Sequence, residues 1–144
     1  MNEAQTVAKY IINHCNRESL LVSNLRLQKI LYFVQADYLV NTDNPCFPDE
    51  IEAWDFGPVV PIVYHNYKQF GSNSIVLLEK NVNNSNITPA DQARINEVIA
   101  ACARYSVSQL VEITHHQTPW LQAYSQNGNR IITKESIKEF FKCD

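Results

Sequence analysis

Two adjacent histidines, His115 and His116, are the residues of this chain that most directly suggest chemistry. Imidazole nitrogens bind metal ions and transfer protons near neutral pH. A zinc site would need further ligands at short spacing, and the sequence has neither an HExxH motif nor a paired Cys/His motif. Adjacent residues of a helix point about 100° apart, so the two rings cannot chelate one ion together. The pattern favours a structural or capping role over partner contact or catalysis, and predicts no catalytic residue, metal or cofactor.

Four carboxylates lie within seven residues, at Asp49, Glu50, Glu52 and Asp55. Paired carboxylates can perform acid–base chemistry, but hydrolysis also needs a positioned nucleophile or oxyanion donors, and the sequence offers none beside them. Two interpretations stay open: a solvated acidic loop, or a docking surface for a basic partner. A small metal-dependent or histidine-dependent hydrolase that uses the two histidines with this segment is the alternative from another functional class.

Four aromatic residues are candidate anchors: Trp54, Phe56, Tyr64 and Trp120. Large aromatic side chains usually pack in a core, and they are also the commonest hot spots of protein interfaces. Core packing suits the two tryptophans best. Phe56 and Tyr64 lie beside a Gly-Pro turn, where exposure is more expected.

These observations define one predicted partner-binding surface. Phe56 and Tyr64 supply its apolar anchors, and charged residues form its rim. The five residues of the surface are Asp49, Glu50, Asp55, Phe56 and Tyr64. The competing interpretation is that the whole segment is an internal brace and that the partner binds elsewhere.

The elements that would position these residues are mostly helices. Helical periodicity predicts a first helix over about residues 3–16 and a second one capped by Asn24. The second helix should bury Leu27, Ile30, Leu31 and Val34 on one face. Gln28-Lys29 would then belong to a solvated face or contact a partner.

The middle of the chain is predicted to hold a short strand over Ile51 to Trp54, with Ile75 to Leu78 as a candidate partner strand. Pro58 suits the first position of a helix that runs to about Phe70 and ends at Gly71.

Cap residues predict the remaining helices. Thr88-Pro89 begins a helix to about Tyr105, a Ser106/Gln109 capping box begins the next one, Thr118-Pro119 begins a third, and Thr133 caps the last. A polar loop is expected over residues 81–86, and a turn over 127–129.

The sequence as a whole predicts a mainly α fold: a compact, single-domain helical bundle of about six to seven helices over residues 1–144, with a small β-hairpin or short strands as an optional addition.

The net charge of −3 and the scattered Lys and Arg argue against direct nucleic-acid binding. No apolar run reaches the roughly 20 residues that cross a bilayer. Neither a signal peptide nor a CxxC pair is present, so we expect a cytoplasmic protein with reduced Cys15, Cys46, Cys102 and Cys143.

Several motifs, in order, resemble one known family, the Panacea antitoxin domain, also described as GepA-like and phage-associated. The first is the Leu-x-Leu-Gln-Lys-Ile-Leu-Tyr-Phe string over residues 25–33. The most specific is Glu-Ala-Trp-Asp-Phe-Gly-Pro-Val-Val-Pro over residues 52–61, with Tyr64 after it. A later motif covers residues 110–115 and continues with Pro119-Trp120 and Ala123.

The resemblance implies a bacterial or prophage protein that binds and neutralises a cognate toxin in a toxin–antitoxin system. Some family members resemble adaptors that deliver a toxin to a Clp-type protease, which is the second interpretation within binding functions. Many members carry a DNA-binding or zinc-containing segment, and this sequence has neither, which puts direct autoregulation in doubt. His115 matches a position of the family's later motif, and the resemblance implies no catalytic role for it.

Overall fold

The computed structural model describes residues 1–77, 86–125 and 130–142. In these ranges the chain forms seven α-helices, one 3-10 helix and a three-stranded antiparallel sheet, so the predicted mainly helical fold is confirmed. The helices are α1 (Ala4–Arg17), α2 (Asn24–Asn41), α3 (Pro61–Tyr67), α4 (Pro89–Cys102), α5 (Val107–His115), α6 (Thr118–Ser125) and α7 (Lys134–Lys142), and the 3-10 helix η1 is Lys68–Phe70.

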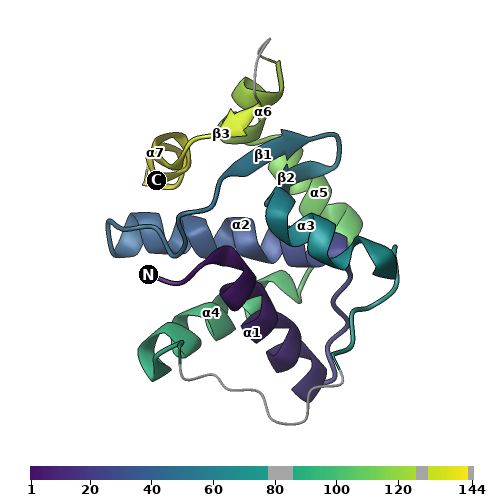
Figure 1. Ribbon diagram of the computed structural model, residues 1–144. Helices are drawn as coiled ribbons and strands as arrows, with labels where there is room; N and C mark the ends of the chain where they lie inside the picture. The colour runs from purple at the N-terminus through teal and green to yellow at the C-terminus, as the bar shows by residue number, and fades with distance from the viewer. Residues whose placement is uncertain (78–85, 126–129, 143–144) are drawn as a thin grey trace.

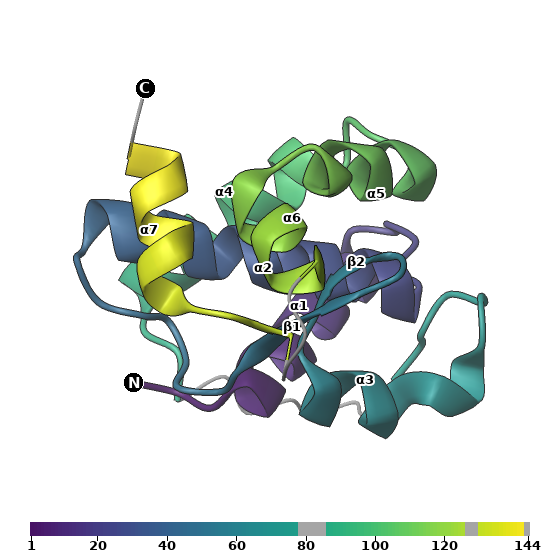
Figure 2. The ribbon, with the colours of Figure 1, turned by 90° about the horizontal axis from the view of Figure 1, so that it is seen from above.

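Helix α2 is the centre of the molecule. It runs across the middle of Figure 1, with α1 and α4 below it and the sheet, α6 and α7 above it. It packs against α1, α3, α4, α5, α7 and strand β2 (Gly57–Val59). Seen from above in Figure 2, α5 and α3 lie on opposite sides of α2. A helix surrounded in this way must be apolar on most of its surface.

The predicted inward face of α2 is confirmed, because Leu27, Ile30, Leu31 and Val34 are all buried. Ser23 is the N-cap, and its side chain accepts a hydrogen bond from the Arg26 amide. The expectation that Asn24 caps this helix is therefore wrong. Ser23 can serve equally well as a cap, and the neighbouring asparagine is drawn inside to other partners.

The sheet has the strand order β2–β1–β3, with β1 (Ile51–Trp54) in the middle and β3 (Ile131–Ile132) on the far edge. β1 and β2 form a tight hairpin in which Trp54 lies opposite Gly57. The strand predicted at Ile51 to Trp54 is confirmed. Its expected partner at 75–78 is wrong for residues 75–77, which are not a strand, and Leu78 lies outside the described residues. Instead the Ile75 amide bonds to the Val22 carbonyl, beside α1.

Helix starts follow the predicted caps in most cases. Thr88 caps α4, and Ser106 and Gln109 form the expected capping box of α5. The expected helix start at Pro58 is wrong, since Pro58 lies in β2 and α3 begins at Pro61. Proline has no amide hydrogen to donate, so it is tolerated both in an edge strand and in the first turn of a helix. Pro58 lies in the edge strand β2, and Pro61 lies in the first turn of α3. Gly71 ends the helical run after η1, as predicted.

Cys15, Cys46 and Cys102 are buried free thiols, and burial raises the pKa of each. Cys143, the predicted turn at 127–129 and most of the predicted loop at 81–86 lie outside the described residues. Within the described part of the chain, no helix combines the length and apolar character needed to cross a membrane.

Candidate partner-binding surface

A cluster of aromatic rings lies on the β1–β2 hairpin and the start of α3. Trp54 is its centre: its ring centroid is 5.0 Å from that of Tyr64, 5.9 Å from Phe56 and 5.9 Å from His65. Trp54, Phe56 and Tyr64 are each half-buried, and His65 is exposed. The rings meet at steep or tilted angles, an arrangement that stabilises aromatic pairs beyond the area they bury. The cluster therefore presents a firm, partly open aromatic surface.

Two polar side chains of α2 support the hairpin from inside. Gln28 accepts a hydrogen bond from the Val60 amide at 2.9 Å and donates to Asn24, which in turn donates to the Tyr64 carbonyl. Lys29 donates to the Pro58 carbonyl at 3.1 Å. The expectation that Gln28 and Lys29 form a solvated face or contact a partner is wrong, because both are completely buried. Their polar groups satisfy backbone atoms of a strand whose edge faces the core.

Lys29 also lies beneath the aromatic cluster. Its Nζ is 5.8 Å from the centre of the Phe56 ring. Burial lowers the pKa of the Lys29 ammonium to about 7, because the charged form loses its hydration inside the protein.

Gly57 permits this close approach. A Cβ at position 57 would lie 2.7 Å from Cε of Lys29 and 2.9 Å from Oγ1 of Thr114, and the backbone φ there is +109°. Only glycine tolerates both conditions without strain. The glycine of the Gly-Pro pair is thus explained by a strand that passes directly over a buried lysine.

The outer end of the hairpin is held by α5 and α6. Trp120 Nε1 donates to the Trp54 carbonyl at 2.8 Å, and His115 Nε2 lies 2.8 Å from the Asp55 carbonyl. The Tyr124 hydroxyl donates to the Asp55 carboxylate, and that hydrogen bond raises the pKa of Tyr124. Three contacts from two helices therefore fix the turn at Asp55.

The rings of these helices form a continuous stack outside the turn. The His115 and Trp120 centroids are 4.2 Å apart, those of Trp120 and Tyr124 are 4.5 Å apart, and Arg130 lies over Tyr124 at 4.6 Å. The later motif of the sequence, from residue 110 to Ala123, thus serves to hold the earlier one.

The five residues of the predicted surface do not all lie together. Asp55, Phe56 and Tyr64 gather around the turn and the start of α3, and the Phe56 and Tyr64 ring centroids are 6.0 Å apart. The β1–β2 hairpin and α3 can be found by their labels in Figures 1 and 2. Asp49 and Glu50 precede β1, at the opposite end of a strand about 13 Å long. Asp49 accepts a hydrogen bond from the Ala4 amide at 2.8 Å and so supports the start of α1, whereas Glu50 is exposed.

The two histidines differ in their surroundings. His115 is engaged by Asp55 and Trp120, and His116 Nε2 lies 3.0 Å from the Glu112 carboxylate one turn earlier on α5. Among the described residues, no three His, Cys, Asp or Glu side chains are placed to share a metal ion. Each imidazole nitrogen named here has a protein partner.

Sequence reasoning missed the contributions of Tyr124 and Arg130 to this surface, and it placed Lys29 outside although Lys29 supports the surface from within. A charged residue within an otherwise apolar helix was the signal for Lys29, because such a residue is either solvated or specifically paired. Nothing in the spacing of Tyr124 or Arg130 indicated that Tyr124 meets Asp55 or that Arg130 covers the Tyr124 ring.

The comparisons with known proteins agree with this architecture. Residues 27–121 match the family model described as "Antitoxin SocA-like, Panacea domain", a range that runs from α2 to α6 and includes the whole braced hairpin. The chain belongs to the SocA-like Panacea antitoxin family. The antitoxin SocA of Caulobacter vibrioides (strain NA1000 / CB15N) is 32% identical over 128 residues, which cover 82% of this chain and 68% of that protein. No solved structure gives a significant match. The Panacea motifs of residues 25–33 and 52–61 are thus the two sides of one contact, between α2 and the hairpin.

Proposed function

We propose that this Panacea-family protein neutralises a cognate toxin protein by binding it directly, without a catalytic step of its own. Membership of the antitoxin family supports a toxin as the partner class. The observation that carries the proposal is the half-exposed aromatic cluster on the braced hairpin. Aromatic side chains held rigidly at a surface are the typical hot spots of protein interfaces, because they lose little conformational freedom on binding.

The surroundings of the histidines favour binding over hydrolysis. His115 Nε2 is engaged by the Asp55 carbonyl and stacked on Trp120, and His116 pairs with Glu112 at the exposed face of α5. A general base must reach a nucleophile or a water in an enclosed site. In the described part of the chain no hydrogen bond joins either histidine to a serine or cysteine.

The proposed docking surface centres on Phe56 and Tyr64, with Asp55 beside them and Asp49 and Glu50 just before β1, at the other end of that strand. The central aromatics should determine most of the affinity. The exposed carboxylates should act mainly on the association rate and on its dependence on salt.

The decisive experiment is co-expression with the product of the neighbouring open reading frame, followed by a growth assay and a pull-down. Tyr64→Ala should weaken toxin binding by about 2 kcal/mol or more, as hot-spot truncations do. Glu50→Ala, the matched control on an exposed rim residue, should change affinity by less than about 1 kcal/mol and act mostly on association.

Two results would contradict this proposal. Full toxin binding by both Phe56→Ala and Tyr64→Ala would place the docking surface elsewhere. Unfolding of both variants in thermal melts would favour the interpretation that the segment is an internal brace.

A further inference from the structure

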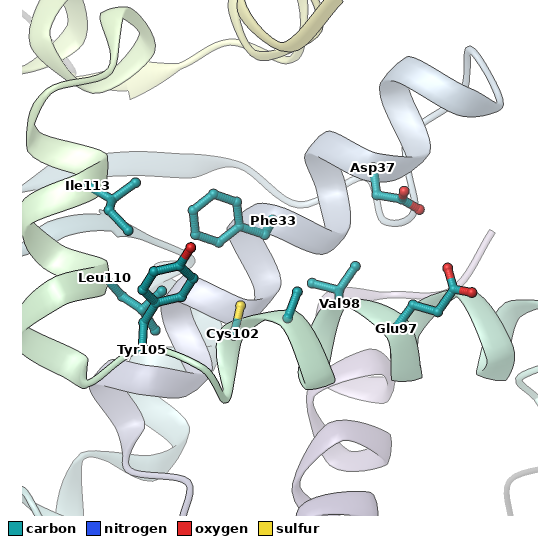
Figure 3. A pocket seen from close by; sticks show the side chains of 9 residues that line it. Phe33, Asp37, Glu97, Val98, Cys102, Tyr105, Leu110 and Ile113 are labelled. Carbon is teal, nitrogen blue, oxygen red and sulfur yellow. The ribbon is translucent and has the colours of Figure 1, made fainter.

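An apolar groove of about 400 Å³ lies between α2, α4 and α5. Figure 3 shows Phe33 of α2 at its centre, Val98 of α4 on one wall, and Leu110 and Ile113 of α5 on the other. Phe33 is half-exposed, although its ring is packed edge-on against Tyr32 and Phe141. A central aromatic ring left open in this way can bury further apolar surface only against another molecule.

The groove is held open by the corner between α4 and α5. Arg26 of α2 donates to the Cys102 carbonyl at 3.0 Å and to the Tyr105 carbonyl at 2.7 Å. These two bonds satisfy carbonyls at the end of α4 and fix the angle at which α5 departs. The Tyr105 side chain, 43% exposed, lines the groove beside Leu110. A groove with fixed walls costs little to organise on binding.

One end of the groove is acidic. Asp37 of α2 and Glu97 of α4 both line this end, and Figure 3 shows them on two helices that face each other. Arg94 pairs with Asp37 at 3.0 Å and offsets one of the two charges. The end therefore keeps a net negative charge next to an apolar floor.

We propose that the groove receives a segment of the toxin whose apolar side chains are followed by a lysine or arginine. The apolar side chains would cover Phe33, Val98 and Ile113, and the cation would reach Glu97. An amphipathic helix is the typical occupant of a groove of this kind. This inference rests on the proposed function, since it assigns a second contact to the same partner.

The groove and the braced hairpin can be covered by one partner because α5 joins them. Leu110 and Ile113 line the groove, and His115 at the end of the same helix holds the Asp55 turn. Five residues of α-helix span only about 7.5 Å. An ordinary interface covers about 800 Å² on each partner, so a partner that occupies the groove can also reach the Asp55 turn.

The test is toxin binding by groove variants, measured beside the wild-type protein with the same co-purified toxin. Ala101 is an exposed residue of α4 that lines the groove. Ala101→Arg fills the groove with a long charged side chain and should weaken binding about tenfold or more. Ala100→Arg is the matched control, because Ala100 is also exposed on α4 but does not line the groove, and it should stay within about twofold of wild type.

A second pair of variants tests the charge. Glu97→Lys should weaken binding about tenfold and reduce the dependence of association on salt, because it places like charges together. Glu18→Lys, the same charge change just beyond the end of α1, should leave affinity within about twofold. Thermal melts establish that each variant is folded.

The outcomes separate the two proposals. If wild type binds the toxin and both Ala101→Arg and Glu97→Lys bind it equally well while folded, the groove assignment is wrong and the proposed function stands. If wild type binds no toxin, both are wrong. Loss of binding in the groove variants together with intact binding in the two controls supports the groove as the second contact.

Discussion

Lys29 shows at the scale of a single residue how this fold uses a polar group. Among the described residues its one hydrogen-bond partner is the Pro58 carbonyl, and the side chain is fully buried between α2 and the hairpin. A buried ammonium without a carboxylate partner favours the neutral amine. Lys29 therefore acts mainly as a long side chain that fills the space under Gly57 and satisfies one carbonyl.

The first prediction concerns pH. The pKa of Lys29 is about 7 in the folded protein and about 10.4 in an unfolded chain, so between these values the unfolded state binds more protons. The free energy of unfolding should therefore rise from pH 7 to pH 8, by up to about 1.4 kcal/mol per unit, and the penalty should be fully present below pH 7. Denaturant titrations at each pH measure it.

Lys29→Met is the comparison protein, because a methionine has a similar length and no charge. It should lack the rise between pH 7 and pH 8. The range stops at pH 8 because the raised pKa of each buried thiol, Cys15 among them, acts in the opposite direction above the ordinary cysteine pKa. An equal slope in both proteins would mean that Lys29 remains charged when buried.

The second prediction concerns Gly57. Gly57→Ala should lower the free energy of unfolding by more than about 1–3 kcal/mol, the usual cost of backbone strain alone, because its Cβ also meets Lys29. Gly71→Ala is the control: φ is +57° there, but no atom lies within 4 Å of the added Cβ. Chemical denaturation of both variants should show the larger loss at Gly57, and equal losses would contradict the close packing described here.

The sequence supports only part of this detail. It indicated Phe56, Tyr64 and Asp55 as a group, because aromatics, acid and Gly-Pro are adjacent in the chain. It placed Gln28 and Lys29 outside, because the period of a helix cannot show that a strand distant in sequence covers its polar side. The sequence assigned Asp49 and Asp55 to the same charged rim. In the structure Asp49 supports the start of α1, whereas Asp55 accepts a hydrogen bond from Tyr124.

At the scale of elements, local chemistry predicts helix starts well. Thr88, Ser106 and Thr133 each cap a helix through a side chain that bonds to a backbone amide three residues later. Each such contact depends on residues within a four-residue segment, so the local sequence is enough to predict it. Strand pairing is decided by distant residues: β3 is two residues long, and it joins β1 from far along the chain. No periodicity can be read from two residues.

The third prediction tests the centrality of α2. Leu31 is completely buried within the helix that contacts most of the others. Leu31→Ala should lower the free energy of unfolding by about 2–5 kcal/mol, the range for a truncated core leucine. Leu21→Ala, at a side chain 78% exposed, should change it by less than about 0.5 kcal/mol. A loss below about 0.5 kcal/mol at Leu31, measured by urea unfolding, would contradict the inward face assigned to α2.

At the scale of the whole molecule, the core and the proposed docking surface are parts of one construction. The turn at Asp55 is exposed, yet it is connected to α2 through Pro58 and Lys29 and to α5 and α6 through three hydrogen bonds. This explains why the motifs resembling the Panacea family lie far apart in sequence: they are the two sides of a single brace. A brace that orients partly open rings can serve stability and recognition together.

The fourth prediction separates these two roles. Tyr124→Phe removes the hydroxyl that holds the Asp55 carboxylate and keeps the ring stacked on Trp120. The folded turn should then sample more conformations and pay more entropy on binding, so the dissociation constant for the toxin should rise about three- to tenfold. Isothermal titration calorimetry would show the loss in the entropy of binding.

Tyr10→Phe provides the matched control, because it removes a tyrosine hydroxyl that donates to Asn96 between α1 and α4, away from the hairpin. That bond is part-buried and Tyr10 itself is buried, so this variant should lower the melting temperature at least as much as Tyr124→Phe does. Its affinity for the toxin should nevertheless remain within about twofold of wild type. If both variants lose affinity in proportion to their loss of stability, the brace acts only on folding. If Tyr124→Phe alone loses affinity, the contact between α6 and Asp55 prepares the hairpin for its partner.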